Sequence, residues 1–550
     1  MPNLPFLRIP PFPRHRAPPL ARSVAGVGSS SIEPAEIRKL LCEARVGGTF
    51  WAPQLDWPQG RDVLIAASNA QVVPMLIDAA AAAGMLDQAV ILGPVNGPPT
   101  IPAWRAADPW EACTSASRVL ADADCEVALV AALLGKAVTV LGNGRFAALS
   151  DTAQLDRVIR EILVEGTAYR DPFTSGAIDL PAAVALLQRW RTQIDANRSV
   201  DQVFGIARWK RVTTDAMLWD GGPVRHARTR AGHTRTLRPG SQALAWVSRS
   251  DPEMLSALQA SGVRIGDIED GMIRSTGLGA NCVPPLSIVV DAQGPHFDPA
   301  QASALETILQ DETIDEDLQA RAAALRARLV GAGISKYEQD AHRAAAPAPA
   351  AHGKRRVLVT GQVEDDRSVL AGGAGIGNLE LLRRARAAEP DAHIIFKPHP
   401  DVEAGHRKGL VDETHARELA DEVDRTSSIA ALLDRVDAVH VLTSLAGFEA
   451  LMRAREVFTH GVPFYAGWGL THDLGPVPAR RTRRRTLDEL VAATLILYPR
   501  YLDPVTRLPC GPETLVERIA AGEATIRSPL IRLRAMQGRV KRLLQGRHRR

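Results

Sequence analysis

Carboxyl groups stand in adjacent pairs at two places in the second half of this 550-residue chain. Glu269 and Asp270 directly precede a glycine, and Asp365 and Asp366 lie within the polar run Gln362–Ser368. A double displacement needs two carboxyl groups, one ionised as the nucleophile and one that takes up and returns a proton. The two pairs are therefore candidates for such chemistry, with a solvated turn as the alternative for each.

Cationic side chains suited to a phosphate follow a predicted strand further along the chain. Lys397 and His399 alternate with prolines in the sequence Lys-Pro-His-Pro, and the prolines fix a turn that directs both side chains the same way. Together they can donate hydrogen bonds to a phosphodiester, and a rigid turn without a ligand is the alternative. We also expect Gln362, in the polar run after the first strand of this domain, to bind the substrate. The glycine-rich turn 371–377 lacks the Gly-Lys-Ser/Thr ending of a P-loop and is only a weak signal.

A predicted helix N-terminus within the stretch 443–473 is the third candidate. The apolar run 436–442 predicts a buried strand, and the helix after it begins at Ser444. Free N–H groups and a positive dipole end at such a terminus favour a phosphate. Glu449, about one turn into the helix, can accept from a ribose hydroxyl, and Gly447 is included in the same nucleotide site. A capped helix without a ligand is the alternative.

Alternating strands and helices must position these groups. Strands are predicted at 355–361, 392–400 and 436–442, with a helix at 378–390, and the loop 461–468 adds two glycines and three aromatic residues. This alternation predicts parallel sheets covered by helices. Ligands of such sheets bind at the carboxyl ends of the strands, where these polar groups stand. The aromatic loop is predicted to form a shaped binding surface.

The first part of the chain contains a second copy of this pattern. Asp124–Gly142 aligns without gaps to Thr443–Gly461, and the motif Tyr-x-Asp-Pro-x-Thr recurs at Tyr169 and Tyr501. The N-terminal copy replaces the polar groups, with Cys125 for Ser444, Ala128 for Gly447 and Val130 for Glu449. It is therefore predicted to bind no nucleotide donor. Chance similarity of two α/β segments is the alternative.

Changes in composition divide the chain into segments. The predicted segments are an irregular N-terminal stretch at 1–40, a degenerate α/β domain at 41–195, an α/β domain at 196–340, an Ala/Pro linker at 341–353, an α/β domain at 354–515 and a basic amphipathic tail at 516–550.

Charge and cysteine usage narrow the class of protein. A net charge of +4 is too small to indicate nucleic acid binding. Five cysteines without C-x-x-C spacing indicate neither a zinc site nor a disulfide framework, and no metal-ligand cluster is visible. The chain has no signal-peptide pattern and no apolar run of about 18 residues. We expect a cytoplasmic protein that its basic residues 527–550 hold at the surface of the inner membrane.

The ordered motifs EDGMIRSTGLG, GQVEDDRS, FKPHPDVEAG, TSLAGFEAL, PFYAGWGLTHD and TLDELVAATLILYPRYLDP resemble those of the bacterial capsule-synthesis family of KpsC type. The resemblance covers about residues 200–515. It implies an α/β fold with a GT-B-like pair of Rossmann-type domains, to which the chain adds a degenerate Rossmann-like N-terminal domain.

The resemblance also implies a function. Members are retaining β-Kdo transferases that use CMP-Kdo (Kdo is 3-deoxy-D-manno-octulosonic acid) to build the Kdo linker on a lipid acceptor of phosphatidylglycerol type. It implies no cofactor and no metal, and capsule export machinery is a further expected partner. By the same likeness Asp366 is the nucleophile and Glu269 the acid/base, His399 with Lys397 holds the CMP phosphate, and Ser444 with Glu449 holds the nucleotide.

Several alternatives stay open at this point. Asp270 or Asp365 can replace Asp366 as the nucleophile. The donor can be a different one, such as CMP-sialic acid or a nucleotide-activated glycerol, and the chain can be a non-catalytic capsule assembly or export protein. One departure from the family is Arg367, which stands where a small residue is usual and can crowd the sugar or contact a phosphate.

Overall fold

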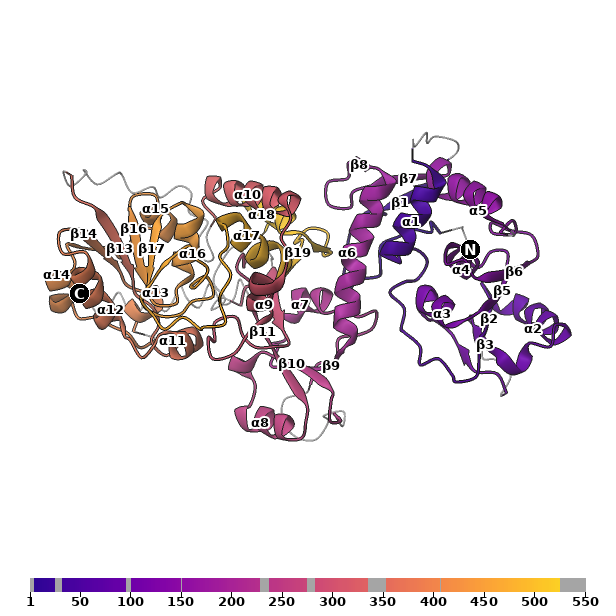
Figure 1. Cartoon of the computed structure of the whole chain (residues 1–550), viewed down its shortest axis with the longest axis horizontal. Helices are drawn as coiled ribbons and strands as arrows, with labels where there is room; N and C mark the ends of the chain where they lie inside the picture. The colour runs from indigo at the N-terminus through magenta and orange to yellow at the C-terminus, as the bar shows by residue number, and fades with distance from the viewer. Residues whose placement is uncertain are drawn as a thin grey trace, which may run out of the picture. The chain divides into compact units, whose positions relative to one another are not determined.

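The computed structural model describes residues 4–24, 32–94, 100–149, 151–227, 237–274, 282–334, 353–405 and 407–524. The chain divides into two compact units, whose elements are labelled in Figure 1. Unit 1 contains Met1–Ser199, Leu218–Val224 and Val505–Leu508, and unit 2 contains the remainder. Residues 341–352 of the predicted linker and 525–550 of the predicted tail lie outside the described residues. Among the described residues, no helix has the length and apolar character needed to cross a membrane.

Unit 1 is built on a parallel five-stranded sheet in the order β4-β3-β2-β5-β6. Its strands are β2 (Val63–Ala66), β3 (Ala89–Leu92), β4 (Ala103–Trp104), β5 (Arg118–Asp122) and β6 (Ala137–Leu141). Every residue of β2 and β3 is buried, as expected for apolar strands covered on both faces. Numbered along the chain, the strands follow the order 3-2-1-4-5, which is Rossmann-type.

Helices and a small antiparallel sheet complete unit 1. They are α1 (Pro34–Ala44), α2 (Val73–Ala82), α3 (Pro109–Ser115), α4 (Glu126–Leu133), α5 (Thr152–Ile159), the π-helix η3 (Arg160–Glu165), α6 (Leu180–Arg198), and strands β1 (Ala21–Ser23), β7 (Thr167–Arg170) and β8 (Ala177–Ile178). Short 3₁₀ turns lie at Ala70–Val72 and Leu86–Gln88.

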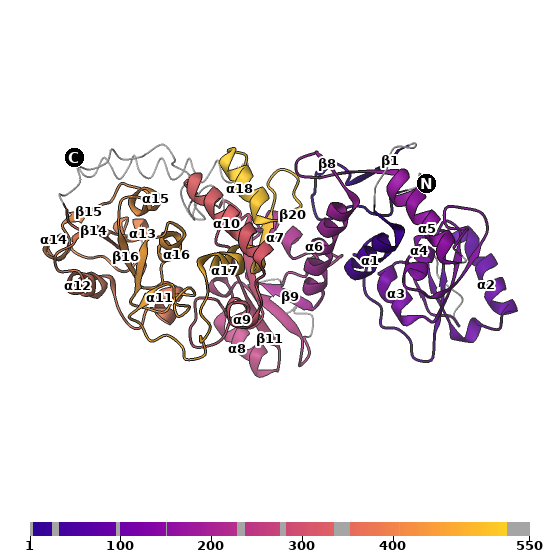
Figure 2. The ribbon, with the colours of Figure 1, turned by 45° about the horizontal axis from the view of Figure 1, so that its top comes forward.

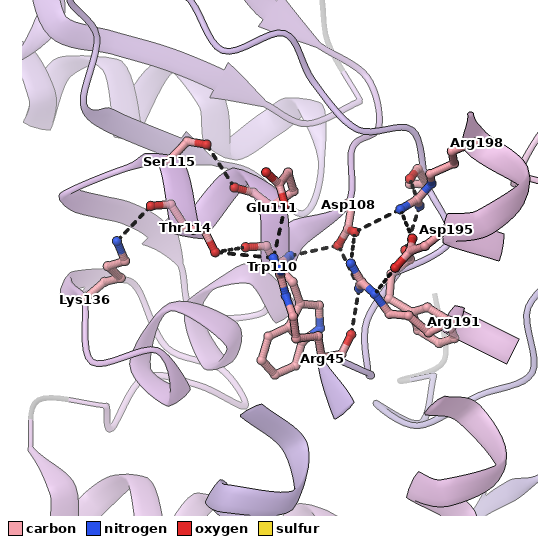
Figure 3. A network of polar contacts seen from close by, with 12 residues as sticks. Arg45, Asp108, Trp110, Glu111, Thr114, Ser115, Lys136, Arg191, Asp195 and Arg198 are labelled. Carbon is pink, nitrogen blue, oxygen red and sulfur yellow. Dashed lines mark hydrogen bonds and ion pairs between the residues drawn. The ribbon is translucent and has the colours of Figure 1, made fainter. Parts of the chain in front are cut away.

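A buried ion-pair network joins α3 to α6 within unit 1 (Figure 3). Asp108 caps α3 by accepting from the backbone N–H of Trp110, and it pairs with Arg191 of α6 at 2.5 Å. Arg191 also donates to the carbonyl of Arg45, and Arg198 lies 3.6 Å from the Asp108 carboxylate. Burial raises the pKa of Asp108, and the two arginines oppose that shift. The network fixes the packing of these helices, because removing one partner would leave a buried charge uncompensated.

The N-terminal stretch is more ordered than the sequence predicts. Strand β1 pairs with β7, and α1 spans the predicted boundary at residue 40. Phe6, Leu7 and Phe12 are buried in the core of unit 1, although their backbone is irregular. Scattered apolar residues between prolines carry no periodic signal, so only the tertiary contacts reveal their role.

One half of unit 2 is a mixed sheet in the order β20-β19-β12-β11-β10-β9, here called the β9 half. Its strands are β9 (Val200–Phe204), β10 (Gln242–Ala245), β11 (Arg264–Asp270), β12 (Ser287–Asp291), β19 (Pro499–Leu502) and β20 (Pro509–Cys510). Its helices are α7 (Arg211–Met217), α8 (Pro252–Ala260), α9 (Ala304–Asp311), α10 (Glu316–Gly331), α17 (Leu487–Val491), the π-helix η6 (Ala492–Leu497) and α18 (Pro512–Ala520), with a 3₁₀ turn at Val247–Arg249.

The other half of unit 2, the β13 half, is a parallel sheet in the order β15-β14-β13-β16-β17-β18. Its strands are β13 (Arg356–Thr360), β14 (His393–Lys397), β15 (Glu422–Val423), β16 (Ala438–Val441), β17 (Glu456–Thr459) and β18 (His472–Asp473). Its helices are α11 (Arg367–Gly372), α12 (Asn378–Ala388), α13 (Pro400–Glu403), α14 (Glu413–Leu419), α15 (Ile429–Leu433) and α16 (Leu445–Met452). Numbered along the chain, the strand order is 3-2-1-4-5-6, that of a dinucleotide-binding Rossmann sheet.

The chain returns to the β9 half after the β13 half is complete. β19 pairs antiparallel with β12, and Arg326 of α10 pairs with Asp488 of α17 at 3.0 Å. Figures 1 and 2 show α10, α17 and α18 side by side, in agreement with their contacts. The sequence placed residues 354–515 in one domain, but their last strands and helices belong to the other sheet. Strand pairing across such a distance leaves no local trace in the sequence.

The internal repeat is visible as repeated structure. The order α5, π-helix η3, β7, β8, α6 in unit 1 recurs as α17, π-helix η6, β19, β20, α18 later in the chain. Tyr169 donates to the carbonyl of Leu163, and Tyr501 donates to that of Leu495 in the same way. With two α/β halves in unit 2 and a Rossmann-type sheet in unit 1, the predicted fold class is confirmed.

Candidate active site

The switch point of the β13 sheet lies between β13 and β16, where the strand order reverses. Gln362, after β13, and Thr443, after β16, bind each other there. The Gln362 Nε2 donates to Thr443 Oγ1 at 3.0 Å, and the Thr443 N–H donates to Gln362 Oε1 at 2.9 Å. Asn378 holds the backbone of Gln362 on its other side. The Gln362 side chain is thus buried and links the ends of β13 and β16 by hydrogen bonds. Its predicted contact with substrate stays a prediction.

Helix α16 begins at this switch point, as predicted. Ser444 caps it by accepting from the N–H of Ala446 at 3.2 Å, and Glu449 is buried one turn further on. A Cβ on Gly447 would lie 2.2 Å from the hydroxyl oxygen of Tyr465, which donates to the carbonyl of Ser444. The packing of Tyr465 therefore accounts for the glycine, whereas its predicted contact with a nucleotide stays a prediction.

The aromatic residues of the loop 461–468 belong to the core. Phe464, Tyr465 and Trp468 are at most 7% exposed, and Trp468 donates to the carbonyl of Phe464. Phe448 of α16 packs against both Phe464 and Tyr465. The prediction that these rings form a binding surface is wrong, because the loop folds under α16 and shields its apolar side.

Lys397 and His399 follow β14 at the same edge of the sheet. Lys397 is the last residue of β14, and His399 caps the short helix α13 by accepting from the N–H of Asp401 at 3.2 Å. Burial lowers the pKa of His399, and the negative charges of Asp401 and Asp366 oppose that shift. Asp366 and His399 thus lie close enough to interact electrostatically, as the predicted site requires.

Asp366 stands at the start of α11. Its carboxylate accepts from the N–H of Ser368 at 3.0 Å and from the Ser368 hydroxyl at 2.7 Å. The neighbouring Asp365 is exposed and pairs with Arg407. Both of these hydrogen bonds end on Oδ1, so the cap does not use Oδ2 of Asp366. The Arg407 partner of Asp365 also acts electrostatically on His399.

The β9 half meets the β13 half at the carboxyl end of β11. Arg367, the first residue of α11, donates to Glu269 at 2.7 Å and to Asp267 at 2.9 Å. Its guanidinium also lies 4.9 Å from the ring centroid of Phe297. Asp267 and Glu269 are two positions apart on one strand, so their side chains share a face. Glu269 was predicted from the sequence and Asp267 was not. The alternation of side chains along a strand would have indicated Asp267, because it lies two positions before Glu269.

Glu269 is the carboxyl group best suited to hold a proton. Its pKa is raised to about 7, first by burial and then by the charge of Asp267, against the opposing charge of Arg367. The charge of Asp270 raises the pKa of Glu269 less than that of Asp267 does. A pKa close to neutrality is the property expected of a residue that exchanges protons during turnover.

Asp270 lies on the opposite face of β11 between two cations. Lys210 contacts its Oδ1 at 3.2 Å and Arg274 contacts its Oδ2 at 2.8 Å. Burial lowers the pKa of Lys210 to about 8, and Asp270 opposes that shift. Lys210 also lies 3.2 Å from the ring centroid of Trp246. Neither cation was identified from the sequence, because Lys210 lies outside the quoted motifs and Arg274, although inside the first motif, gives no local sign of its contact with Asp270.

The junction therefore holds Glu269, which is suited to exchange protons, next to Arg367, the residue that follows Asp366. Asp270 lies on the other face of β11. The described residues contain no group of three or more His, Cys, Asp or Glu side chains arranged to hold a metal ion. Metal-independent turnover stays a prediction.

Comparison with known proteins gives consistent matches. The family "Capsule polysaccharide biosynthesis protein" matches residues 248–501. The capsule polysaccharide modification protein LipA of Neisseria meningitidis is 38% identical over 358 residues, which are 64% of this chain and 49% of LipA. The lipopolysaccharide-processing protein LpsZ of Rhizobium meliloti is 40% identical over 309 residues, which are 54% of this chain and 69% of LpsZ.

The chain thus spans about half the length of LipA. Among solved structures, the β-Kdo 2,4 transferase of Thermosulfurimonas dismutans KpsC is 28% identical with a TM-score of 0.48, and the match covers 58% of this chain and 98% of that one. From its similarity to LpsZ and the matched family, the chain belongs to the capsule polysaccharide biosynthesis protein family.

Proposed function

We propose that the chain is a retaining β-Kdo transferase that uses CMP-Kdo to build the Kdo linker on a lipid acceptor in capsular polysaccharide biosynthesis. Family membership supports the capsule context. The observation that carries the proposal is the junction of the two halves, where Glu269, with a pKa of about 7, lies among carboxylates and cations suited to an anionic sugar donor.

The reaction would run as a double displacement. A carboxylate oxygen of Asp366 or Asp270 attacks the anomeric carbon of Kdo, the bond to the phosphate oxygen breaks, and CMP leaves with the electron pair. The acceptor hydroxyl then attacks the same carbon, Glu269 takes its proton, and the enzyme carboxylate leaves. Because phosphate is a good leaving group, Glu269 is needed chiefly as the base of the second step.

The nucleotide would occupy the carboxyl edge of the β13 sheet. His399 and Lys397 would hold the phosphate, while the N-terminus of α16 with Ser444 and Glu449 would hold the nucleoside. We expect Glu449→Ala and His399→Ala each to abolish transfer in a folded protein. Turnover is expected to survive EDTA, because carboxylates and fixed cations supply the chemistry of each step.

The test of the donor is CMP release from CMP-Kdo and from CMP-sialic acid, each with a lipid-like acceptor, with the product anomer read by NMR. Release from CMP-Kdo with a β-linked product supports the proposal. Release from CMP-sialic acid alone would assign a different donor, and release from neither would favour a non-catalytic assembly role.

The nucleophile can be identified by mass spectrometry. Protein incubated with CMP-Kdo in the absence of acceptor should carry a covalent Kdo on a peptide that contains either Asp366 or Asp270. The Asp→Asn variant at the labelled position should lose the adduct, whereas the same variant at the other position should keep it.

We also propose that residues 527–550, which lie outside the described residues, hold the protein at the cytoplasmic face of the inner membrane, close to a lipid-linked acceptor and the export machinery. Deleting them should weaken sedimentation with phosphatidylglycerol vesicles and spare transfer to a water-soluble acceptor. Unchanged sedimentation would show that another part of the protein contacts the membrane.

A further inference from the structure

Arg367 departs from the family motifs at the junction, because it stands where a small residue is usual. Its guanidinium spans two carboxylates of the β9 half, with one nitrogen on Glu269 and another on Asp267, although the residue itself belongs to α11 of the β13 half. A planar fork of this kind matches the geometry of planar carboxylates and of phosphates, and both partners that Arg367 has here are carboxylates. The contact therefore marks a position in the junction that is built for carboxylates.

The two carboxylates that Arg367 contacts differ in accessibility. The Asp267 side chain is 8% exposed, whereas the side chains of Glu269 and Arg367 are 22% and 32% exposed. The second oxygen of Asp267, Oδ1, is buried and has no hydrogen-bond partner among the described residues. Asp267 is thus the buried partner of the guanidinium, whereas Glu269 is the partner that is more exposed to solvent.

The pairing also places two carboxylates close together beside one guanidinium. Asp267 and Glu269 lie on the same face of β11, and holding like charges close together in a buried site is unfavourable. A ligand carboxylate that displaces Glu269 from the guanidinium would keep Arg367 paired with Asp267 and would release the Glu269 oxygens. The ring of Phe297 would support the guanidinium in either state.

We propose that Arg367 is a carboxylate-exchange residue, which holds Glu269 in the ligand-free protein and transfers to the carboxylate of an acidic sugar donor while it stays anchored on Asp267. This inference rests on the proposed function, because it requires a donor sugar that carries a carboxylate. Binding of the donor would thereby free Glu269 to take the proton of the acceptor hydroxyl. The base would be masked until a donor occupies the site.

The exchange would change the charges around Glu269. The groups that act on it are Asp267 and Asp270 on its own strand, Arg367 of α11, Lys210 beside α7, and Tyr498 beside η6. The positive charge of Arg367 opposes the rise in the pKa of Glu269, and that of Asp267 promotes it. Replacing Arg367 should therefore move the Glu269 limb of the pH–rate profile upward, and replacing Asp267 should move it downward.

Calorimetric titration of the full chain with two probes tests the inference. The probes are 2-deoxy-Kdo, which has the carboxylate without a phosphate, and CMP, which has the phosphate without the sugar carboxylate. Arg367→Met should weaken the binding of 2-deoxy-Kdo by about tenfold or more, the loss expected for one charge-assisted contact, and leave CMP binding within about twofold. Arg367→Lys should restore only part of the loss, because the fork is missing.

The control is Arg417→Met, which removes the same charge from an exposed i,i+4 pair with Glu413 on α14. It should leave both titrations unchanged. A loss of CMP binding in Arg367→Met, with 2-deoxy-Kdo binding retained, would make Arg367 a phosphate ligand and overturn the inference. Equal binding of both probes to wild type and Arg367→Met would overturn it as well.

The pH profiles provide a readout that a structural role would not give. Arg367→Met and Asp267→Asn should shift the Glu269 limb of kcat/KM in opposite directions, and shifts in the same direction would contradict the exchange. A wild-type protein that neither binds 2-deoxy-Kdo nor releases CMP from CMP-Kdo would overturn the proposed function and the inference together. A wild-type protein that does both, with Arg367 variants indistinguishable from it, would overturn the inference alone.

Discussion

Glu269 owes its predicted role to its surroundings, since burial and Asp267 together raise its pKa to about 7. As a base it must be ionised, so kcat/KM should rise as the pH increases through about 7 in the wild type. Glu269→Gln should lower kcat by about 10²–10⁴-fold, the usual contribution of a general base, and should remove this rise. Steady-state kinetics between pH 5.5 and pH 8.5, with Glu418→Gln on α14 as the exposed control, would check this. A retained rise in Glu269→Gln would assign the base to another group.

His440, on β16, and His460, directly after β17, form a second pair of unusual groups, for which the sequence predicted no role. Both rings are buried, and Nδ1 of His440 lies 3.0 Å from Nε2 of His460. The His440 ring also stacks on the ring of Phe458. Burial is the first cause that lowers the pKa of His440 to about 3 and that of His460 to about 4. Both rings should therefore stay neutral in the folded protein at pH 5.

This pair should make the protein sensitive to acid. The stability that a depressed histidine contributes is present above its unfolded pKa of about 6.5 and is lost as the pH falls toward the folded value. Between pH 7.5 and pH 5 the loss should be of the order of 2 kcal/mol per histidine. Urea unfolding at the two pH values would measure it, and the double variant His440→Gln/His460→Gln should show a smaller difference. Imidazole NMR shifts typical of charged rings at pH 5 would contradict this account.

At the scale of single elements, Gly447 shows how a motif residue can be required for packing. A Cβ at this position would lie 2.2 Å from the Tyr465 hydroxyl and 2.7 Å from its ring carbon Cζ. We expect Gly447→Ala to destabilise the protein by about 1–3 kcal/mol, the usual cost of overpacking a core. Gly331→Ala is the matched control in α10, because nothing lies within 4 Å of its added Cβ. Thermal unfolding that finds both variants equally stable would exclude the packing role.

The arginine run 480–485 also has a meaning that its sequence does not reveal. Such a run reads as an exposed basic patch, yet Arg485 donates to the carbonyls of Leu309 and Glu312 at the end of α9. Arg481 pairs with Glu306 of the same helix at 2.9 Å. These side chains satisfy the free carbonyls of a helix C-terminus and tie α9 of the β9 half to the segment that follows β18.

The local sequence pattern predicted where helices and strands lie, but it did not predict which of them pair or pack together. The strands around Val357, Ile394 and Val439 and the helix capped by Ser444 were predicted within about three residues, since apolar runs and capping residues are local signals. The aromatic loop was wrongly predicted to be a binding surface, because aromatic residues look alike in a site and in a core. The ligand contacts predicted for Gln362 and Gly447 stay predictions, although both residues also have packing roles. Arg367 could be recognised as unusual, but its two partners lie about 100 positions away.

At the scale of the whole molecule, the two Rossmann-type sheets have different switch points. In unit 1 the place between β2 and β5 is filled by Ser68, whose N–H and hydroxyl each contact the carboxylate of Asp122 at 2.7 Å. Cys125 caps no N–H of α4, and Val130 is fully buried. These features favour a unit 1 that binds no nucleotide.

The full chain should accordingly bind one CMP. Isothermal titration of wild type is expected to give one site per chain, and Glu449→Ala should abolish it, because the proposed nucleotide site lies at the edge of the β13 half. Binding that survives in Glu449→Ala, or a stoichiometry of two, would mean that unit 1 kept a nucleotide site.

The late return of the chain to its earlier sheet has a consequence for synthesis on the ribosome. β12 ends at Asp291, and its partner β19 begins only at Pro499, about 200 residues later. At translation rates of about 5–20 residues per second, the edge of β12 would wait roughly 10–40 s for its neighbour. An apolar edge without a partner is a template for pairing with other chains. Until Pro499 and the residues after it have emerged from the ribosome, the edge of β12 should therefore be prone to pair with other copies of the chain. We expect binding of a chaperone to this edge, or a low concentration of nascent chains, to limit such aggregation.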